Sequence, residues 1–312
     1  MKFSVDPWDP SYGIANEAEA LEPTSADVNA DIELATDEWR PLDPAAGAQA
    51  ESVLFIDGVR RVEARVWLDD GAGGVHAGIC ASYAAGAARC SSAARIGPVI
   101  VDRGLFTSFG QAESVTTRSG AFPARLAAGE GTEALSLALQ ERMGQAEVTA
   151  AEAACAEAPA DLVVIDGPLR GRQHLSHAVG YVKTHHVAYL PAELHALVGG
   201  LAPGQRSPLF VLGTSWSRLA WYLRLPGTTE IPWSGVVRCE CSPDLQLPAA
   251  KELADRITST LPRFASEPHK EPRAPQNLYP IAGLERELRR RMGDPQVLYR
   301  ALRRSAHTSV SA

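Results

Sequence analysis

The sequence predicts a mixed α/β protein, because strands joined by short turns come first, a long helix follows, and a short apolar strand comes next. The first strand-like segments, between residues 53 and 84, are separated by only a few residues, so we expect them to pair antiparallel. A helical crossover over residues 132–158 leads to a strand at 161–166 that is apolar enough to be buried on both faces. With 312 residues, of which 45% are hydrophobic and 21% charged, the chain can bury a sizeable core. We therefore expect one α/β domain with appended ends.

The antiparallel strands begin at residue 53. Residues 53–58, Val-Leu-Phe-Ile-Asp-Gly, predict a buried strand that ends at a turn, and residues 62–68 alternate in polarity up to a Gly-rich turn at 69–74. We interpret these two segments as a hairpin and expect a third strand at 75–84. Residues 98–101 predict a further strand or a loop.

The helix at 132–158 is favoured by its Ala, Leu, Glu and Gln content, with Thr132 as its N-cap and Pro159 after its end. Further strands are predicted at 179–190, 208–213, 218–225 and 235–241. Helices are predicted at 248–264 and in the segments that follow Pro280 and Pro295.

Charge is distributed unevenly along the chain. Residues 1–52 hold twelve acidic residues against two basic ones, and the whole chain has a net charge of −7. Residues 263–304 hold ten Lys and Arg against five acids, which is typical of a phosphate-binding surface or of a solvated helix face. We divide the chain into an acidic arm at 1–50 with one short helix, a central domain at 51–295, and a C-terminal helix and tail at 296–312.

Composition also argues against several classes of protein. The apolar runs are far shorter than the roughly 20 residues that cross a bilayer, and the first 30 residues are acidic, the reverse of a secretory signal. The five cysteines include no C-x-x-C pair, so we expect reduced, structural thiols and neither disulfides nor a zinc site. We expect a cytoplasmic protein that does not bind a membrane.

Two carboxylates are candidate site residues, Asp57 in Phe-Ile-Asp-Gly and Asp166 in Val-Ile-Asp-Gly. Each ends a strongly apolar strand, where an ionised carboxylate is costly to desolvate unless a cation or hydrogen-bond donors compensate. Each Asp-Gly pair is also consistent with a plain turn. If the two strands are neighbours, the carboxylates converge, and Mg²⁺ or Mn²⁺ would be the cation that suits them.

The order of these elements resembles the ribonuclease H-like fold. Motifs at 55–61 (FIDGVRR), 164–169 (VIDGPL), 180–184 (GYVKT) and 276–285 (QNLYPIAGLE) resemble, in the same order, those of the NurA nuclease family. The resemblance extends over residues 50–295. It implies a manganese-dependent DNA nuclease that works in DNA end resection with the hexameric ATPase HerA, as a homodimer.

The resemblance assigns roles to individual residues. Asp57 and Asp166 match aspartates that bind metal and take part in catalysis. The family also uses a glutamate on the helix between them. Glu133 is our first choice for this ligand, and Glu141 and Glu147 remain alternatives.

The C-terminal motif adds further residues. Tyr279 matches the tyrosine of the family's Tyr-Pro motif and is a catalytic candidate. Glu287 falls where relatives often have His or Asp, and as a carboxylate it can still bind a hard cation. Lys183 matches a lysine that follows the central aspartate in the family and is a catalytic candidate that could contact a phosphate, although it can equally be a surface lysine on a strand.

Phosphodiester cleavage needs a more acidic nucleophilic water and neutralisation of charge on the phosphate, and two oxygen-ligated Mn²⁺ or Mg²⁺ ions supply both. Arginines near the two aspartates are expected either to position DNA phosphates or to form structural ion pairs. They are Arg60, Arg61, Arg170 and Arg172.

The function that the resemblance implies is a DNA nuclease with 5′–3′ exonuclease and single-strand endonuclease activity. The alternative is a catalytically inactive, nuclease-like subunit that binds DNA and docks on a translocating ATPase. A third hypothesis, a hydrolase with Ser215 as nucleophile, is disfavoured because Gly213-Thr-Ser-Trp-Ser lacks the second glycine of a nucleophile elbow. Trp221 and Tyr222 can stack on bases, but the alternation of the surrounding strand favours core packing.

Overall fold

The structure is a computed structural model that describes residues 22–23, 26–47, 49–227 and 233–310. The strands are β1 (Glu22–Pro23), β2 (Asp27–Asn29), β3 (Val53–Asp69), β4 (Val75–Cys90), β5 (Ala94–Thr107), β6 (Val115–Thr117), β7 (Gly120–Phe122), β8 (Ala124–Leu126), β9 (Leu162–Asp166), β10 (Ala178–Val182), β11 (Val187–Ala188), β12 (Phe210–Gly213), β13 (Ser217–Arg224) and β14 (Val236–Cys241). The helices are α1 (Gly131–Glu157), α2 (Ala192–Gly199), α3 (Leu247–Thr260), α4 (Tyr279–Arg291) and α5 (Pro295–Val310), with short 3₁₀ helices η2 (Thr36–Glu38) and η3 (Leu261–Phe264).

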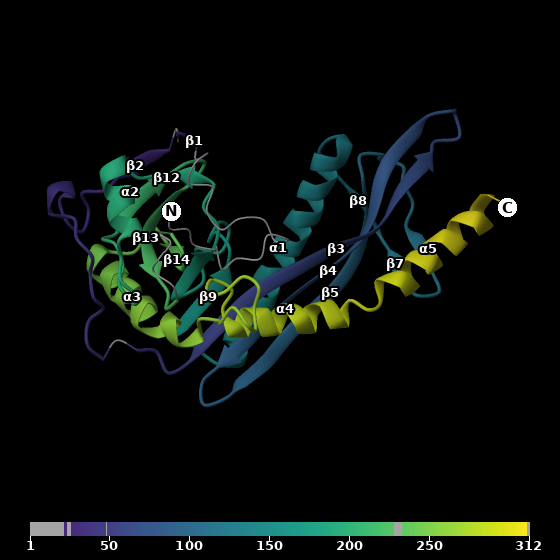
Figure 1. Ribbon diagram of the computed structural model, residues 1–312. Helices are drawn as coiled ribbons and strands as arrows, with labels where there is room; N and C mark the ends of the chain where they lie inside the picture. Colours follow the sequence, from purple (N-terminus) through teal and green to yellow (C-terminus); the bar gives the residue numbers. More distant parts are fainter. Residues whose placement is uncertain (1–21, 24–25, 48, 228–232, 311–312) are drawn as a thin grey trace, which may run out of the picture. The chain divides into compact units, whose positions relative to one another are not determined.

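The mixed α/β class is confirmed. A sheet in the order β2-β12-β13-β14-β10-β9-β3-β4-β5-β8 carries both parallel and antiparallel pairs, and helices flank it (Figure 1). Among the described residues, no helix combines the length and the apolar character needed to span a membrane. The chain groups into two compact units. The first consists of Met1–Phe55, Arg89–Arg95 and Pro159–Ala282, and the second of Ile56–Ala88, Ile96–Ala158 and Gly283–Ala312.

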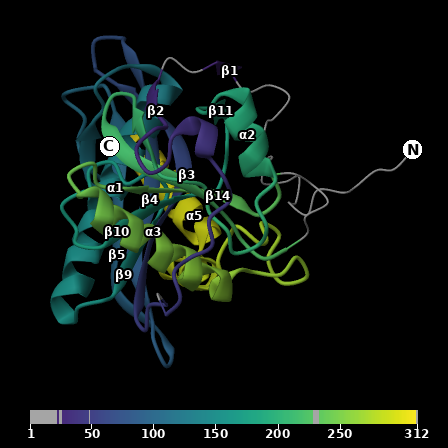
Figure 2. The same cartoon turned by 90° about the vertical axis from the view of Figure 1, so that its left-hand side faces the viewer.

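In the first unit, β10 pairs parallel with β9 and antiparallel with β14, and β13 links β14 to β12. Alternate residues of β13 point to opposite faces. Ala220 and Tyr222 belong to a buried cluster with Leu194 of α2, whereas α3 contacts β13 from the other side of the strands (Figures 1 and 2). Trp221 is fully buried. The expectation that this strand serves core packing is therefore confirmed.

The described part of the N-terminal segment is folded onto the first unit. β2 pairs with β12, and the buried Trp39 donates a hydrogen bond from Nε1 to the carbonyl oxygen of Ala30 at 2.9 Å. Glu33 is held by Arg206, whose guanidinium donates to both carboxylate oxygens at 2.8 and 2.9 Å. The predicted short helix corresponds to η2. The rest of the predicted acidic arm, residues 1–21, lies outside the described residues.

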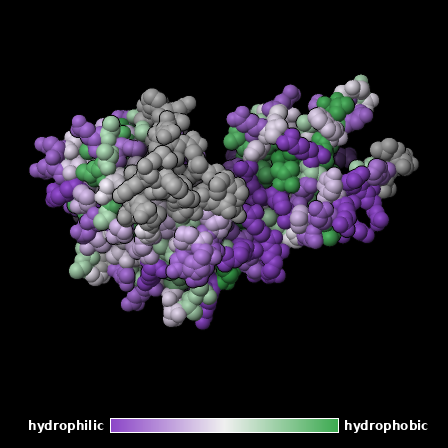
Figure 3. Space-filling model, in the orientation of Figure 1, coloured by the Kyte–Doolittle hydropathy of each residue, from purple (hydrophilic) through white to green (hydrophobic). Residues whose placement is uncertain are grey.

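In the second unit, helices cover both faces of β4. Ile79, Tyr83 and Leu139 belong to one buried cluster, which places α1 against one face of the strand. Cys80, which points the other way, packs in a second cluster with Leu302 of α5. The surface over α4 and α5 is strongly hydrophilic in Figure 3, in agreement with the basic residues predicted to be exposed there.

The first hairpin prediction is wrong, because β3 runs without interruption through Asp57 and Gly58. Gly58 is needed for close packing and not for a turn: a Cβ atom there would overlap Oε1 of Glu147 and lie 2.9 Å from Cγ of Met143. The turn before β4 is confirmed, since the amide of Asp70 donates to the carbonyl of Gly74.

The later elements follow the predicted order. The strand at 161–166 is confirmed as β9, and the long helix as α1, although α1 begins at Gly131 without a side-chain cap, so Thr132 is not its N-cap. The strand predicted over 179–190 ends as β10 at Val182. The segment beyond it holds the two-residue β11, and α2 begins at Ala192.

Candidate metal centre

Asp57 lies in the buried first part of β3. Phe55 and Ile56 before it are fully buried, and Asp57 itself is only 5% exposed. Its Oδ1 accepts a hydrogen bond from the amide of Gly58 at 2.7 Å. A carboxylate at this depth is held rigidly, and ionisation there requires nearby donors or a cation.

Asp166 is the last residue of β9 and is half-buried. The ammonium of Lys183 donates to its Oδ2 at 2.6 Å and to Oδ1 of Asn277 at 3.0 Å. Lys183 reaches it because β10 pairs parallel with β9, with Tyr181 opposite Asp166. The hydroxyl of Tyr181 donates to the carbonyl of Gln276 at 2.6 Å, which fixes the segment that leads into α4.

Glu285 lies on α4, within a stripe of apolar residues. Ile281 and Leu288, four residues before and three after it, are fully buried. Residues at these spacings share one face of a helix, so Glu285 belongs to the face that α4 buries. It is itself half-buried.

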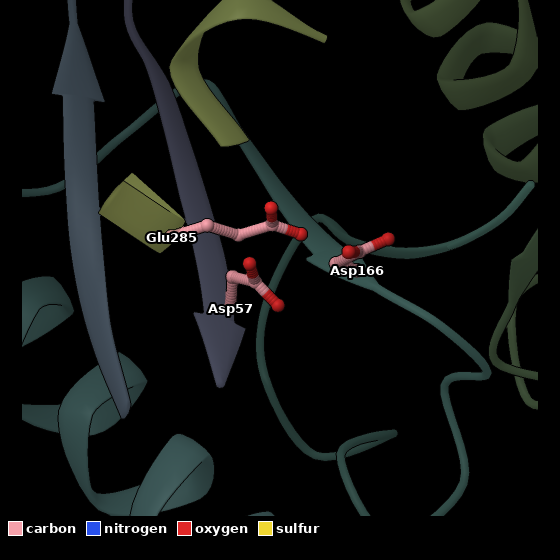
Figure 4. Close-up of side chains that lie close together, drawn as sticks. All are labelled: Asp57, Asp166 and Glu285. Carbon is pink, nitrogen blue, oxygen red and sulfur yellow. The ribbon is translucent and has the colours of Figure 1, made fainter. Parts of the chain in front are cut away.

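Asp57, Asp166 and Glu285 form an acidic cluster (Figure 4). Each offers one carboxylate oxygen, and these oxygens all lie within 4.8 Å of one another. β9 and β3 are hydrogen-bonded neighbours in the sheet, as the convergence of the two aspartates requires. Among the residues that the structure describes, no other group of three His, Cys, Asp or Glu side chains has this arrangement.

Of the three glutamates of α1 considered as a metal ligand, the one that packs against β3 is the alternative Glu147. Glu147 is 4% exposed, and its carboxylate packs directly against Gly58, the residue after Asp57. Glu133, our first choice, lies in the first turn of α1 and is exposed, as is Glu141. The buried face of α1 thus presents Glu147 toward β3.

Two predicted residues near the C-terminus have other contacts. Glu287 accepts hydrogen bonds from Arg290 and Arg291, and these guanidinium groups lower its pKa to about 2. It is two residues from Glu285, and a helix turns by about 200° over two residues, so the two side chains point in different directions. Tyr279 donates its hydroxyl hydrogen bond to Glu267 at 3.0 Å.

The arginines predicted to bind phosphate differ in their hydrogen bonds and ion pairs with other groups of the protein. Arg61 pairs with the buried carboxylate of Glu63 and donates to the carbonyl of Gly293, so it has a structural role. Arg60 is exposed and donates to Ser136. Arg170 and Arg172 follow Asp166 in an irregular segment.

Lys183 is engaged with Asp166, as described above, and is only 12% exposed, so it is not a surface lysine. Ser215 lies in the turn between β12 and β13, where the amide of Thr214 donates to the carbonyl of Trp216. Sequence reasoning did not identify Glu285. The signal for it is an acid that interrupts an otherwise apolar stripe on α4.

Comparisons with known proteins were made for the whole chain. A search of curated proteins gives no significant match. The family model for the NurA domain matches residues 129–290, just over half of the chain. The matched span includes Asp166 and Glu285, whereas Asp57 precedes it. The chain therefore belongs to the NurA family, whose members are nucleases associated with HerA in DNA processing.

Proposed function

We propose that this protein is a divalent-metal-dependent DNA nuclease whose centre is formed by Asp57, Asp166 and Glu285. The observation that carries the proposal is the cluster of three carboxylates on a strand, a strand end and a helix, with oxygens within 4.8 Å of one another. Three acids at this spacing repel one another, and a cation between them removes the repulsion.

The donor set suits a hard cation. Carboxylate oxygens are preferred by Mg²⁺ and Mn²⁺, whereas zinc and iron sites favour imidazole or thiolate ligands. Glu147 packs where a Cβ of Gly58 would lie, and neighbouring residues of a strand point to opposite faces, so this contact does not add Glu147 to the carboxylates around Asp57. We propose that the site of Asp57, Asp166 and Glu285 holds Mn²⁺ or Mg²⁺, with two ions as the family resemblance implies.

When bound, such ions acidify a nucleophilic water and neutralise charge on the cleaved phosphodiester. The protein's own contribution is to hold the ligands in place. Lys183 fixes the orientation of Asp166 through a 2.6 Å hydrogen bond, and the rigid strand β3 fixes Asp57. Arg60, Arg170 and Arg172 are our candidates for contacts with DNA phosphates, because their guanidinium groups match phosphate oxygens in bidentate pairs.

The finer assignments follow from the family resemblance. We propose a ribonuclease H-like core, a homodimer, and a HerA-type hexameric ATPase as the partner that delivers DNA. The proposed activity is 5′–3′ exonuclease with cleavage of single strands. Tyr279, which matches the family's Tyr-Pro motif, remains a candidate for a catalytic contact with DNA.

The test is degradation of end-labelled linear single-stranded and double-stranded DNA by the purified protein with Mn²⁺, Mg²⁺ or EDTA. Asp57→Asn, Asp166→Asn and Glu285→Gln should each reduce cleavage at least a hundredfold. Glu287→Gln, on the same helix, is the matched control and should cleave like the wild type.

Two outcomes would contradict the proposal. Equal loss in Glu285→Gln and Glu287→Gln would mean that α4 does not contribute Glu285 as a ligand. Absence of cleavage under all metal conditions, repeated with the ATPase partner present, would replace the proposal with a non-catalytic subunit that docks on the ATPase.

A further inference from the structure

A pocket lies beside Asp166, within the first unit. It has a volume of about 460 Å³, in the range of small-molecule sites in proteins. Its walls come from the end of β9, from β10 and the segment after it, and from β14. The side chains that concern its chemistry are those of Asp166, Lys183, His186, Tyr189, Arg238 and Arg273.

The pocket carries a surplus of positive charge. Among the described residues that line it, Asp166 is the only acid, and Lys183 already neutralises it. Arg238 is only 6% exposed and pairs with Oε1 of Glu240, but the same carboxylate oxygen also accepts from Arg218 at 2.9 Å. One buried carboxylate thus serves two buried guanidinium groups, and the unbalanced charge faces the pocket through Arg238. An anionic ligand would compensate it.

Arg273, from the segment between η3 and α4, adds a further cation to the lining. Its Nε lies 3.4 Å from Oε1 of Glu271, and its side chain is 18% exposed. A guanidinium in this setting can pair with phosphate oxygens in a bidentate contact. The lining therefore favours a phosphate over a neutral ligand.

An aromatic ring completes the pocket. Tyr189 is half-buried, and the guanidinium of Arg238 lies 5.0 Å from the centre of its ring. The cation holds the ring in place by a cation–π contact. A ring fixed at the wall of a positively charged pocket is the arrangement on which nucleobases stack, with no preference for sequence.

The pocket and Asp166 are held by shared contacts. Oε2 of Glu240 accepts the amide hydrogen of Leu169, three residues after Asp166, at 3.3 Å. The segment 167–169 also lies directly on Gly180, where a Cβ atom would collide with the amide nitrogen of Leu169. A ligand in the pocket would thus be positioned relative to the Asp166 carboxylate.

We propose that this pocket binds one deoxynucleotide of the DNA strand, with its phosphate at Arg238 and Arg273 and its base on Tyr189. The proposal rests on the proposed nuclease function for its biological meaning, because it makes the pocket the site of the nucleotide next to the cleaved bond. Its chemistry, recognition of a nucleoside monophosphate, is tested without cleavage.

The experiment is calorimetric titration of the full-length protein with thymidine monophosphate, thymidine and inorganic phosphate, in EDTA. Arg273→Gln and Tyr189→Leu should each weaken the binding of the monophosphate at least tenfold. Thymidine should respond only to Tyr189→Leu, and phosphate only to Arg273→Gln. Tyr189→Phe keeps the ring and should bind like the wild type, which separates stacking from loss of folding.

Tyr299→Leu and Arg300→Gln, both at exposed positions of α5, are the matched controls and should change nothing. Lack of saturable binding at millimolar concentration, or equal affinity in the wild type and in both pocket variants, would overturn the inference. Binding of thymidine monophosphate no tighter than that of inorganic phosphate, and unaffected by Tyr189→Leu, would overturn it as well. The titrations are made in EDTA, whereas DNA cleavage needs a divalent metal. A loss of nucleotide binding is therefore distinguished from a failure of the proposed nuclease function.

Discussion

Asp57→Asn is expected to stabilise the protein when no metal is present, although it removes a residue of the proposed centre. The three carboxylate oxygens lie within 4.8 Å of one another. At an effective dielectric constant of about 20, two like charges at such a distance repel by about 3 kcal/mol. Asparagine is isosteric and can still accept the hydrogen bond that Gly58 donates to Oδ1.

The net gain is smaller than the pairwise repulsion, because the Lys183 ammonium, 2.6 Å from Asp166, already offsets part of the charge. We expect the free energy of unfolding to rise by about 1–3 kcal/mol and the unfolding temperature by several degrees. With Mn²⁺ added, the wild type should gain stability and the variant should not, since ligand binding stabilises only the state that binds it.

The assay is thermal unfolding followed by circular dichroism, in EDTA and in excess Mn²⁺. Asp37→Asn, at an exposed position in η2, changes the net charge equally and should shift stability by less than about 0.5 kcal/mol. If Asp57→Asn lowers stability in EDTA, and Mn²⁺ stabilises the variant as much as the wild type, Asp57 is a structural hydrogen-bond acceptor and the reasoning is refuted.

Three further predictions concern packing and buried charge. Gly58→Ala should destabilise the fold by about 1–3 kcal/mol in urea denaturation, because the added methyl group overlaps the carboxylate of Glu147. Arg206→Met should cost about 3–5 kcal/mol, because it leaves the carboxylate of Glu33, 2% exposed, without its bidentate partner. Burial lowers the pKa of His185 to about 3. Between pH 6.5 and 3 the unfolded chain therefore binds a proton that the folded protein does not, and stability falls as the pH falls, by about 1.4 kcal/mol per pH unit. His185→Gln should remove this contribution to the pH dependence of the free energy of unfolding.

Matched variants exist for all three. Gly110→Ala adds a methyl group where no atom lies within 4 Å and should be tolerated. Lys251→Met removes a half-exposed cation 3.8 Å from Glu33 and should cost less than about 1 kcal/mol. His186→Gln, at an exposed position, should keep the wild-type pH slope. Equal effects in a variant and its control would contradict the corresponding argument.

The sequence identified the two aspartates because an acid after a run of apolar strand residues is a strong local signal. It could not identify Glu285, because the choice between Glu285 and Glu287 depends on the rotation of α4 about its axis. That rotation is fixed by the burial of Ile281 and Leu288, which is a property of tertiary packing. The apolar stripe is visible in the sequence, but the position of Glu287 after the Tyr-Pro motif matched the family's pattern and favoured Glu287 as the ligand.

The fold shows the same division between local and tertiary signals. β9 and β13 were predictable because their apolar patterns are short, strong and bounded by turn residues. The course of β3 through Gly58 was not, since Asp-Gly is a common turn pair and the reason for this glycine is its packing against Met143 and Glu147, more than 80 residues later in the chain. The docking of Glu33 on Arg206 likewise depends on residues that are distant in sequence.

The central claim is that Glu285 and the two aspartates bind a divalent cation. Electron paramagnetic resonance of Mn²⁺ measures it directly, because the signal of the hydrated ion disappears on binding. We predict that the wild type and Glu287→Gln bind Mn²⁺ with the same affinity and that Glu285→Gln binds it at least tenfold more weakly. Equal binding by wild type and Glu285→Gln would contradict the account.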